Sequence, residues 1–214
     1  MDVQLLEAAL YGRLEVMESL LNIGANIESK DVHGRTPLHM AAGHGYYEVV
    51  EFLFTKGANI ESKDVQGHTP LHLASHIYGS LGVVGFLVEN GSNIESKDVK
   101  GRTPLHKATM SGFFEIARLL VKKGANIECK DFHGLTPLEW AVIRNNLEFV
   151  KLLRERKERL LKEYISSKKI QYFFRIITAK NVANRLRVEP DNLFDPEFSG
   201  RRKIILKIDD SRFI

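Results

Sequence analysis

The sequence contains very little cysteine and no long apolar segment. Cys129 is the only cysteine among 214 residues, so no disulfide can form within the chain. No apolar run approaches the roughly 18 residues needed to cross a bilayer, which argues against a transmembrane helix. The N-terminus, MDVQLLEAALYGRLEV, lacks a basic start followed by an apolar stretch, so we expect no cleaved secretory signal. These absences predict a reducing, cytoplasmic location, with signal-less export into another cell left open.

Motifs of catalysis are also missing. The sequence has no Gly-rich phosphate loop, no G-x-S-x-G elbow and no pair of catalytic carboxylates. His68, His72 and His76 follow one another at the four-residue spacing that can bind zinc on a helix. However, His68 precedes the Thr69–Pro70 pair that predicts the start of the helix, so a structural role is favoured for these residues. We therefore expect no enzyme activity, no metal and no cofactor.

Short acidic and basic sets also recur in the chain, beginning with Glu28–Asp31. Their mixed charges and loop setting are interpreted as solvated hairpins. Cys129 occupies the position that Ser29, Ser62 and Ser96 hold in the other copies. It is therefore not expected to act as a nucleophile.

The formal net charge of +4 conceals a division within the chain. Residues 151–214 contain 17 Lys and Arg against 9 Asp and Glu, a net charge of +8. Residues 1–150 contain 14 against 18, a net charge of −4. Binding to nucleic acid or to an anionic surface is therefore expected, if anywhere, in the basic C-terminal extension.

One 16-residue segment recurs along the chain. GANIESKDVHGRTPLH begins at Gly24, and close copies begin at Gly57, Gly91 and Gly124, at intervals of 33, 34 and 33 residues. A weaker unit over residues 1–30 precedes them, which gives about five repeats, above the minimum of roughly three that stacking needs.

Each repeat predicts two helices. Thr36 is a favourable N-cap, and Pro37 suits the first helical position because its missing N–H would be unpaired there. Gly45 marks the turn to a second helix, and Gly57 stands where a left-handed cap is expected. A single pair of helices cannot bury its apolar face alone, so neighbouring repeats must stack.

These residues resemble the ankyrin-repeat family over residues 1 to about 153. The resemblance rests on TPLH at a 33-residue period, after a D-x-x-G turn and before a G-A-N turn. It implies two antiparallel helices and a projecting hairpin-like loop per repeat, a His of TPLH that bonds loop backbone, and protein recognition without catalysis. We therefore expect an all-α solenoid with repeats at about 1–30, 31–63, 64–97, 98–130 and 131–157, followed by a mostly helical extension over 154–214.

The candidate partner-binding surface lies where the repeats differ. The resemblance implies that the loop positions after the recurring Asp and the end of each first helix lie on the concave side. Apolar side chains ringed by basic and His side chains are common at interfaces. For Val32, Val65 and Val99 the alternative interpretation is that they only stack loop upon loop. The candidate residues are Val32, His33, Arg35, His44, Val65, Gln66, His68, His76, Ile77, Tyr78, Lys100, Arg102, Met110, Phe132, His133, Ile143 and Arg144.

The third repeat differs from the others. It spans one more residue between Pro70 and Gly91 than its neighbours do, with the surplus placed near Ile77–Gly82. It also carries Gly82 and Gly85 where other repeats have Glu, and a mid-helix Gly costs about 1 kcal/mol relative to Ala. We predict a bulged turn in the least stable repeat. The turn is interpreted either as a loop adapted to a partner or as sequence drift.

The repeat signature stops after Leu153. The last helix is expected to run to about Tyr164, a second amphipathic helix is expected around Phe173, and a strand is expected over 204–208. The extension is interpreted as a cap on the last repeat, as a docking element of an adaptor, or as a binder of nucleic acid or an anionic surface. The main prediction is a protein-binding scaffold with an unidentified protein partner, monomeric on its own. The basic residues of the third interpretation are Lys168, Lys169, Arg175, Lys180, Arg185, Arg187 and 201–203.

Overall fold

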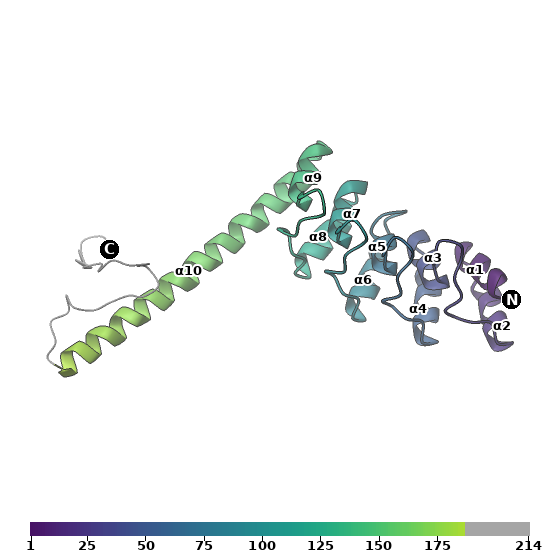
Figure 1. Cartoon of the computed structure of the whole chain (residues 1–214), viewed down its shortest axis with the longest axis horizontal. Helices are drawn as coiled ribbons and strands as arrows, with labels where there is room; N and C mark the ends of the chain where they lie inside the picture. Colours follow the sequence, from purple (N-terminus) through teal and green to yellow (C-terminus); the bar gives the residue numbers. More distant parts are fainter. Residues whose placement is uncertain (187–214) are drawn as a thin grey trace. The chain divides into compact units, whose positions relative to one another are not determined.

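The computed structural model describes residues 1–186, and the side chains of residues 1–168 (Figure 1). This part of the chain contains ten α-helices and no strand. The chain divides into two units, Met1–Lys157 and Glu158–Ile214. The helices are α1 (Asp2–Leu10), α2 (Leu14–Asn22), α3 (Pro37–His44), α4 (Tyr47–Thr55), α5 (Pro70–Ala74), α6 (Leu81–Glu89), α7 (Pro104–Ser111), α8 (Phe114–Lys122), α9 (Pro137–Ile143) and α10 (Leu147–Leu186).

Within the first unit the helices form two layers (Figure 1). The first helices of the repeats pack in the order α1, α3, α5, α7 and α9. The second helices α2, α4, α6 and α8 pack in a parallel order, and each contacts the first helix of its own repeat. The expected all-α solenoid of helix pairs is therefore confirmed.

The caps of α3 show why the repeats begin and end where they do. Thr36 is the N-cap, Pro37 is the first helical residue, and the Thr36 side chain accepts a hydrogen bond from the backbone of His39. Gly45 follows the helix with φ +79°, a left-handed conformation that glycine adopts without steric strain. The predicted cap and turn are both confirmed.

The core lies between the two layers. Leu38 on α3 is 1% exposed, and Leu53 on α4 is fully buried. Ala41 is also fully buried, because its small side chain lets neighbouring first helices approach closely. Equivalent leucines at 5, 71 and 105 are fully buried, so the core continues from one repeat to the next.

The third repeat has the predicted bulged turn. Its first helix, α5, has five residues, whereas α3 and α7 have eight. Gly79, with φ +65°, takes the role that Gly45 and Gly112 have in the neighbouring repeats. The extra residue therefore precedes Gly79 and lies in the turn Ser75–Tyr78, slightly upstream of its predicted place.

The prediction that the last helix ends near Tyr164 is wrong. α10 runs from Leu147 to Leu186 without interruption. The physical reason is that residues 147–186 contain no Gly and no Pro, so nothing in the chain stops the helix. The helix expected around Phe173 is part of α10 and not a second helix, and its side chains there lie outside the described ones. The strand expected over 204–208 lies outside the described residues.

Candidate partner-binding surface

Each loop is folded around one aspartate. Asp98 Oδ1 accepts hydrogen bonds from the backbone N–H groups of Lys100, at 2.8 Å, and Arg102, at 2.9 Å. The same pair of bonds recurs at Asp31, Asp64 and Asp131. These bonds fix the turn between the Asp and the TPLH motif, so each loop presents its tip in a defined conformation.

Backbone hydrogen bonds also join each loop to the next. The N–H of Val65 donates to the carbonyl of His33 at 2.9 Å, and Val99 N–H donates to Gln66 in the same way at 2.9 Å. Phe132 N–H continues the series to Lys100 at 2.9 Å. The loops therefore stack through their backbones, as one interpretation of the valines predicted.

The side chains at these tips nevertheless remain in solvent. Val32 is 92% exposed, Val65 61%, Val99 51% and Phe132 76%. The loops thus stack through their backbones while their tip side chains stay exposed. The tips form a row of apolar groups held in place by the ladder of backbone hydrogen bonds between loops.

The His of TPLH links each repeat to the next. His39 Nδ1 accepts from the backbone N–H of Thr36 at 3.2 Å and lies 2.8 Å from the Thr36 hydroxyl. Its Nε2 lies 2.9 Å from the carbonyl oxygen of His68 in the following loop. His72 and His106 bond the carbonyls of Arg102 and Leu135 in the same way, at 3.0 and 3.2 Å.

This network requires neutral imidazole rings with the proton on Nε2. A proton on Nδ1 would break its bonds from the threonine, so the charged ring fits poorly. Burial lowers the pKa of His39 and His106, and it lowers the pKa of His72 to about 4, although bonds to the next loop's carbonyl oppose the shift. These three histidines are structural, as the resemblance implied.

The last repeat carries Glu139 in place of this histidine. Glu139 Oε2 accepts from the Thr136 N–H at 2.6 Å and from the Thr136 hydroxyl at 2.9 Å, which reproduces the cap. A carboxylate has no proton to donate to a further loop, and within residues 1–186 no such loop follows the fifth repeat.

Three of the predicted contact residues hold the loops through their charged or polar ends. Arg35 Nη2 pairs with Asp31 at 2.7 Å, and Arg102 Nη2 pairs with Asp98 at 2.8 Å. His68 lies between two carboxylates, with Nδ1 3.1 Å from Asp64 and Nε2 3.4 Å from Asp98. These bonds are a structural role that the sequence pattern did not predict.

Asp98 is the centre of this cluster, and its side chain is fully buried. Burial alone would raise its pKa, but the nearby His68 ring and hydrogen bonds from Arg102 and the loop backbone outweigh burial and hold the pKa far below the usual range. Asp98 is therefore a buried anion that several cations and N–H groups share.

Lys107 is a member of this cluster that sequence reasoning missed. It lies on α7, is 3% exposed, and has its Nζ 3.7 Å from Asp98 Oδ2. Burial lowers its pKa to about 8. The available signal was its alignment with Met40, Leu73 and Trp140, the inward-facing position of each first helix.

Trp140 shows how the last repeat replaces the same contact. Its indole Nε1 donates to Asp131 Oδ2 at 2.9 Å. Leu135 stands where Arg35 and Arg102 stand in other repeats and cannot pair with a carboxylate.

The bulged turn of the third repeat contacts the repeats on both sides. Ile77 packs so closely on Gly43 that a Cβ added there would lie 3.0 Å from Ile77 Cδ1. The Tyr78 ring lies 5.0 Å from the ring of His44, while 64% of Tyr78 remains exposed. His76 Nδ1 lies 2.5 Å from the Ser111 hydroxyl on the other side.

The remaining predicted residues lie at the loop tips or at the ends of first helices. Met110 and His44 are half-buried. The exposed ones are His33, Gln66, Lys100, His133, Ile143 and Arg144.

A second set of contacts between repeats was not predicted. Glu28 Oε1 accepts from the Asn59 N–H at 2.7 Å, and its Oε2 accepts from the Ser62 hydroxyl at 2.9 Å. Glu61 and Glu95 bridge to the following repeats similarly. The interpretation of these sets as solvated hairpins therefore fits their lysines, which are exposed, but it missed the glutamates, whose carboxylates fasten successive loops together.

A comparison with models of protein families gives a match. A family model described as ankyrin repeats (3 copies) matches residues 5–98 and 77–163. No curated protein matches the chain. In the part of the chain that the structure describes, no helix is both long and apolar enough to cross a membrane. Within the same residues, no group of three or more His, Cys, Asp or Glu is placed to hold a metal ion.

Proposed function

The chain belongs to the ankyrin-repeat family, whose repeats are protein-interaction modules, and on this premise we propose that it is a non-catalytic scaffold that binds a partner protein. The proposed contact surface consists of the loop tips and the ends of the first helices. It includes the exposed residues at 32, 65, 78, 132 and 143.

The observation that carries this proposal is the row of exposed apolar tips. The ring of Phe132 lies against Gly101 of the preceding loop, yet the residue remains 76% exposed, so most of its apolar surface is open to a partner. The backbone ladder holds each tip in place, so little conformational entropy would be lost when a partner binds. Rigid aromatic and aliphatic anchors on a fixed frame are typical of binding surfaces.

A second candidate role concerns the helix of the C-terminal unit. On α10, Leu161 is 57% exposed and Tyr164 is 60% exposed. Leu160 and Ile165 add to this face at 39% and 43%. An adaptor would use the repeats to select one protein and this face to dock to another.

Affinity capture from nuclease-treated lysate of the cells that express the protein tests the main proposal. The full-length chain is compared with the double variant Tyr78→Ala/Phe132→Ala. The matched control is Val16→Ala/Leu81→Ala, which removes two apolar side chains that are 44% and 45% exposed on second helices.

Loss of two anchors should weaken the captured complex by about 10-fold or more, while the control changes it by less than about 2-fold. Equal retention by both variants, with loss on Leu161→Ala/Tyr164→Ala, would favour the adaptor role. If the full-length chain captures a protein from untreated lysate but not from nuclease-treated lysate, the protein-binding proposal is refuted.

A further inference from the structure

Charge is segregated between two parts of the repeat region. We compare the inner segments 30–44, 63–78, 97–111 and 130–144, which comprise the loop tips and first helices, with the rest of residues 1–150. The inner segments contain 9 Lys and Arg against 5 Asp and Glu, and all 8 histidines. The rest contains 5 against 13. A region with net charge −4 therefore has a basic inner part.

The acids of the inner segments are all engaged within the fold. Each recurring Asp accepts two backbone hydrogen bonds, and Glu139 caps its own helix. In contrast, Lys100 and Arg144 are exposed and form no ion pair within the described residues. The charge left for a partner to meet is thus positive.

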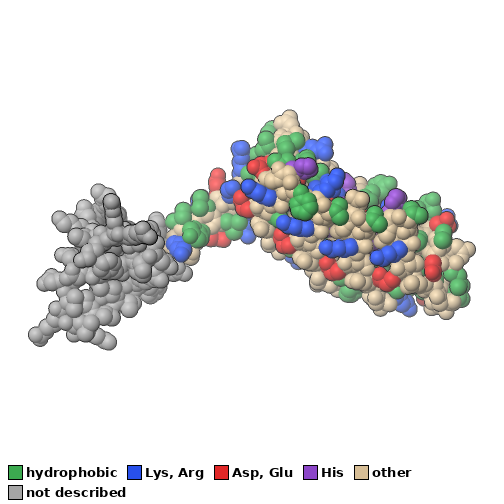
Figure 2. Space-filling model, viewed as in Figure 1, with side chains coloured by type: hydrophobic (Ala, Val, Ile, Leu, Met, Phe, Trp, Pro, Cys, Tyr) green, Lys and Arg blue, Asp and Glu red, His purple; other side chains and the backbone are tan. Residues whose placement is uncertain are grey.

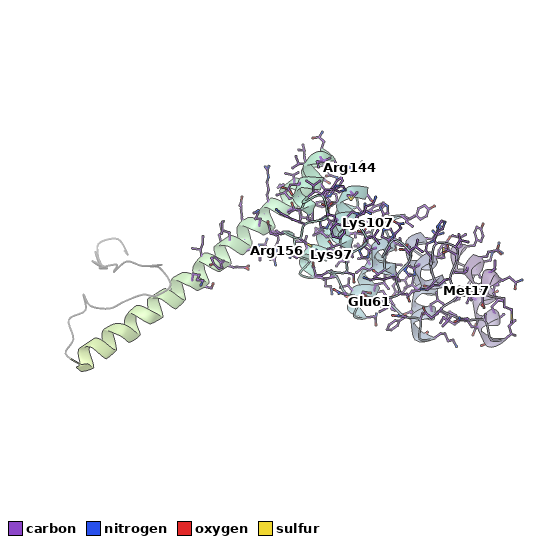
Figure 3. All side chains as sticks on the ribbon, viewed as in Figure 1. Met17, Glu61, Lys97, Lys107, Arg144 and Arg156 are labelled. Atoms are coloured by element: carbon purple, nitrogen blue, oxygen red, sulfur yellow. The ribbon has the colours of Figure 1, made fainter. Side chains whose placement is uncertain are left out.

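The positive charge is concentrated in the fourth repeat. Residues 97–111 carry four of the nine inner cations and a single acid, the buried Asp98. Figure 3 labels Lys107 and Arg144 along the side of the first helices, and Figure 2 shows histidine and apolar side chains along the same margin. His76 lies in this field: burial and the nearby cations Lys107 and Arg102 lower its pKa to about 4.

We propose that the partner contacts this surface through an acidic segment, rich in Asp and Glu and carrying a large apolar side chain. The segment lies across the third to fifth repeats, with its carboxylates near Lys100 and Arg144 and its apolar group against Phe132 or Tyr78. This inference rests on the proposed function, and it adds the chemistry of the partner. Complementary charge accelerates association and fixes the register of a bound chain.

Three of the nine inner cations are not free to bind the phosphates of a nucleic acid. Binding to phosphates gains affinity with each Lys or Arg that contacts the backbone. Here the guanidinium groups of Arg35 and Arg102 are already paired with aspartates, and Lys107 is 3% exposed. The tips between the cations are valines and a phenylalanine, which offer no donor to a phosphate.

The first experiment selects a random peptide library displayed on phage against the full-length chain. Selected peptides are then tested against Tyr78→Ala/Phe132→Ala. We expect enrichment of Asp and Glu beside an aromatic or aliphatic residue, in peptides whose binding the double variant abolishes. Surface-specific peptides with neutral or basic sequences would overturn the acidic-segment inference and leave the scaffold function standing. A library that yields no peptide sensitive to the double variant would count against both.

The second experiment tests charge directly with one selected acidic peptide, labelled for fluorescence anisotropy. Lys100→Glu/Arg144→Glu should raise its Kd by about 10-fold or more. Lys56→Glu/Lys122→Glu makes the same change in net charge on exposed second-helix sites and should raise Kd by less than about 2-fold. Equal effects of the two variants would show a response to net charge alone and overturn the proposal.

A labelled oligonucleotide completes the comparison. We expect that Lys100→Glu/Arg144→Glu does not weaken any binding of the oligonucleotide to the chain. Oligonucleotide binding at this surface tighter than that of the acidic peptide would overturn the inference in favour of nucleic acid. The far-UV circular dichroism and thermal unfolding of every variant must match those of the parent chain.

Discussion

The stability of the repeat region should fall as the pH is lowered through the range in which free histidine titrates. His72 has a pKa of about 4 in the folded chain against an ordinary value of 6.5, because burial disfavours its charged form. As the pH falls below 6.5, the unfolded chain binds the proton and the folded chain does not. The stabilising contribution of His72 is therefore complete above pH 6.5 and is lost between that value and about 4.

The size of the effect follows from proton linkage. At about pH 5, His72 alone should lower the free energy of unfolding by about 2 kcal/mol relative to about pH 7.5, and by about 3 kcal/mol near pH 4. His39 and His106, whose pKa values are also lowered by burial, contribute with the same sign. Asp98 adds to this change at the lowest pH values, because its pKa is lowered in the folded chain and the unfolded carboxyl therefore takes up its proton first, near its ordinary pKa of 3.8.

Urea unfolding followed by far-UV circular dichroism at the two pH values measures this change. His72→Gln removes the titrating ring, so the variant should be less stable at neutral pH and should lose about 2 kcal/mol less than the parent on acidification. His33→Gln, at an exposed loop position, is the control and should keep the parent's pH dependence. If His72→Gln shows the same loss as the parent, buried neutral histidines are not the cause.

Three substitutions test other features of the repeats by urea unfolding. Gly85→Ala should stabilise the chain by up to about 1 kcal/mol, because it lies within α6 and the new methyl would meet its nearest neighbour at 3.9 Å; a destabilised variant would contradict this. Gly79→Ala should destabilise the chain by about 2 kcal/mol or more, because φ is +65° there and the new Cβ would lie 2.4 Å from the Phe113 ring. An unchanged midpoint of urea unfolding would refute the assigned turn. Glu61→Ala should destabilise by about 1–2 kcal/mol through loss of its two bonds to the next repeat, whereas exposed Glu51→Ala on α4 should change stability by less than about 0.5 kcal/mol.

Local sequence predicted the helix pairs well. Thr36 and Pro37 start α3, and Gly45 ends it, because each residue acts on its own few neighbours. The extra residue of the third repeat was detectable by counting, and the turn appeared close to where counting placed it.

Contacts across repeats were not predictable in the same way. The carboxylate of Glu28 bonds Ser62 in the next repeat, and the ring of His68 lies beside Asp98 of the next repeat. A charged side chain in a sequence indicates a solvated position unless its spatial partner is known, and these partners come from the stacking of repeats. The length of α10 was misjudged because two helices were expected, the first ending near Tyr164, although no Gly or Pro separates them in the sequence.

The change from histidine to Glu139 has a consequence for how such an array can lengthen. In a unit with the histidine, the ring N–H points to a carbonyl oxygen of the following loop, so each such unit is matched to a successor. The unit with glutamate has no such N–H to donate. Duplication of an interior unit would therefore keep the bond at every junction between repeats. A copy added after the fifth repeat would lack that bond, because its loop carbonyl would face a carboxylate instead of a donor.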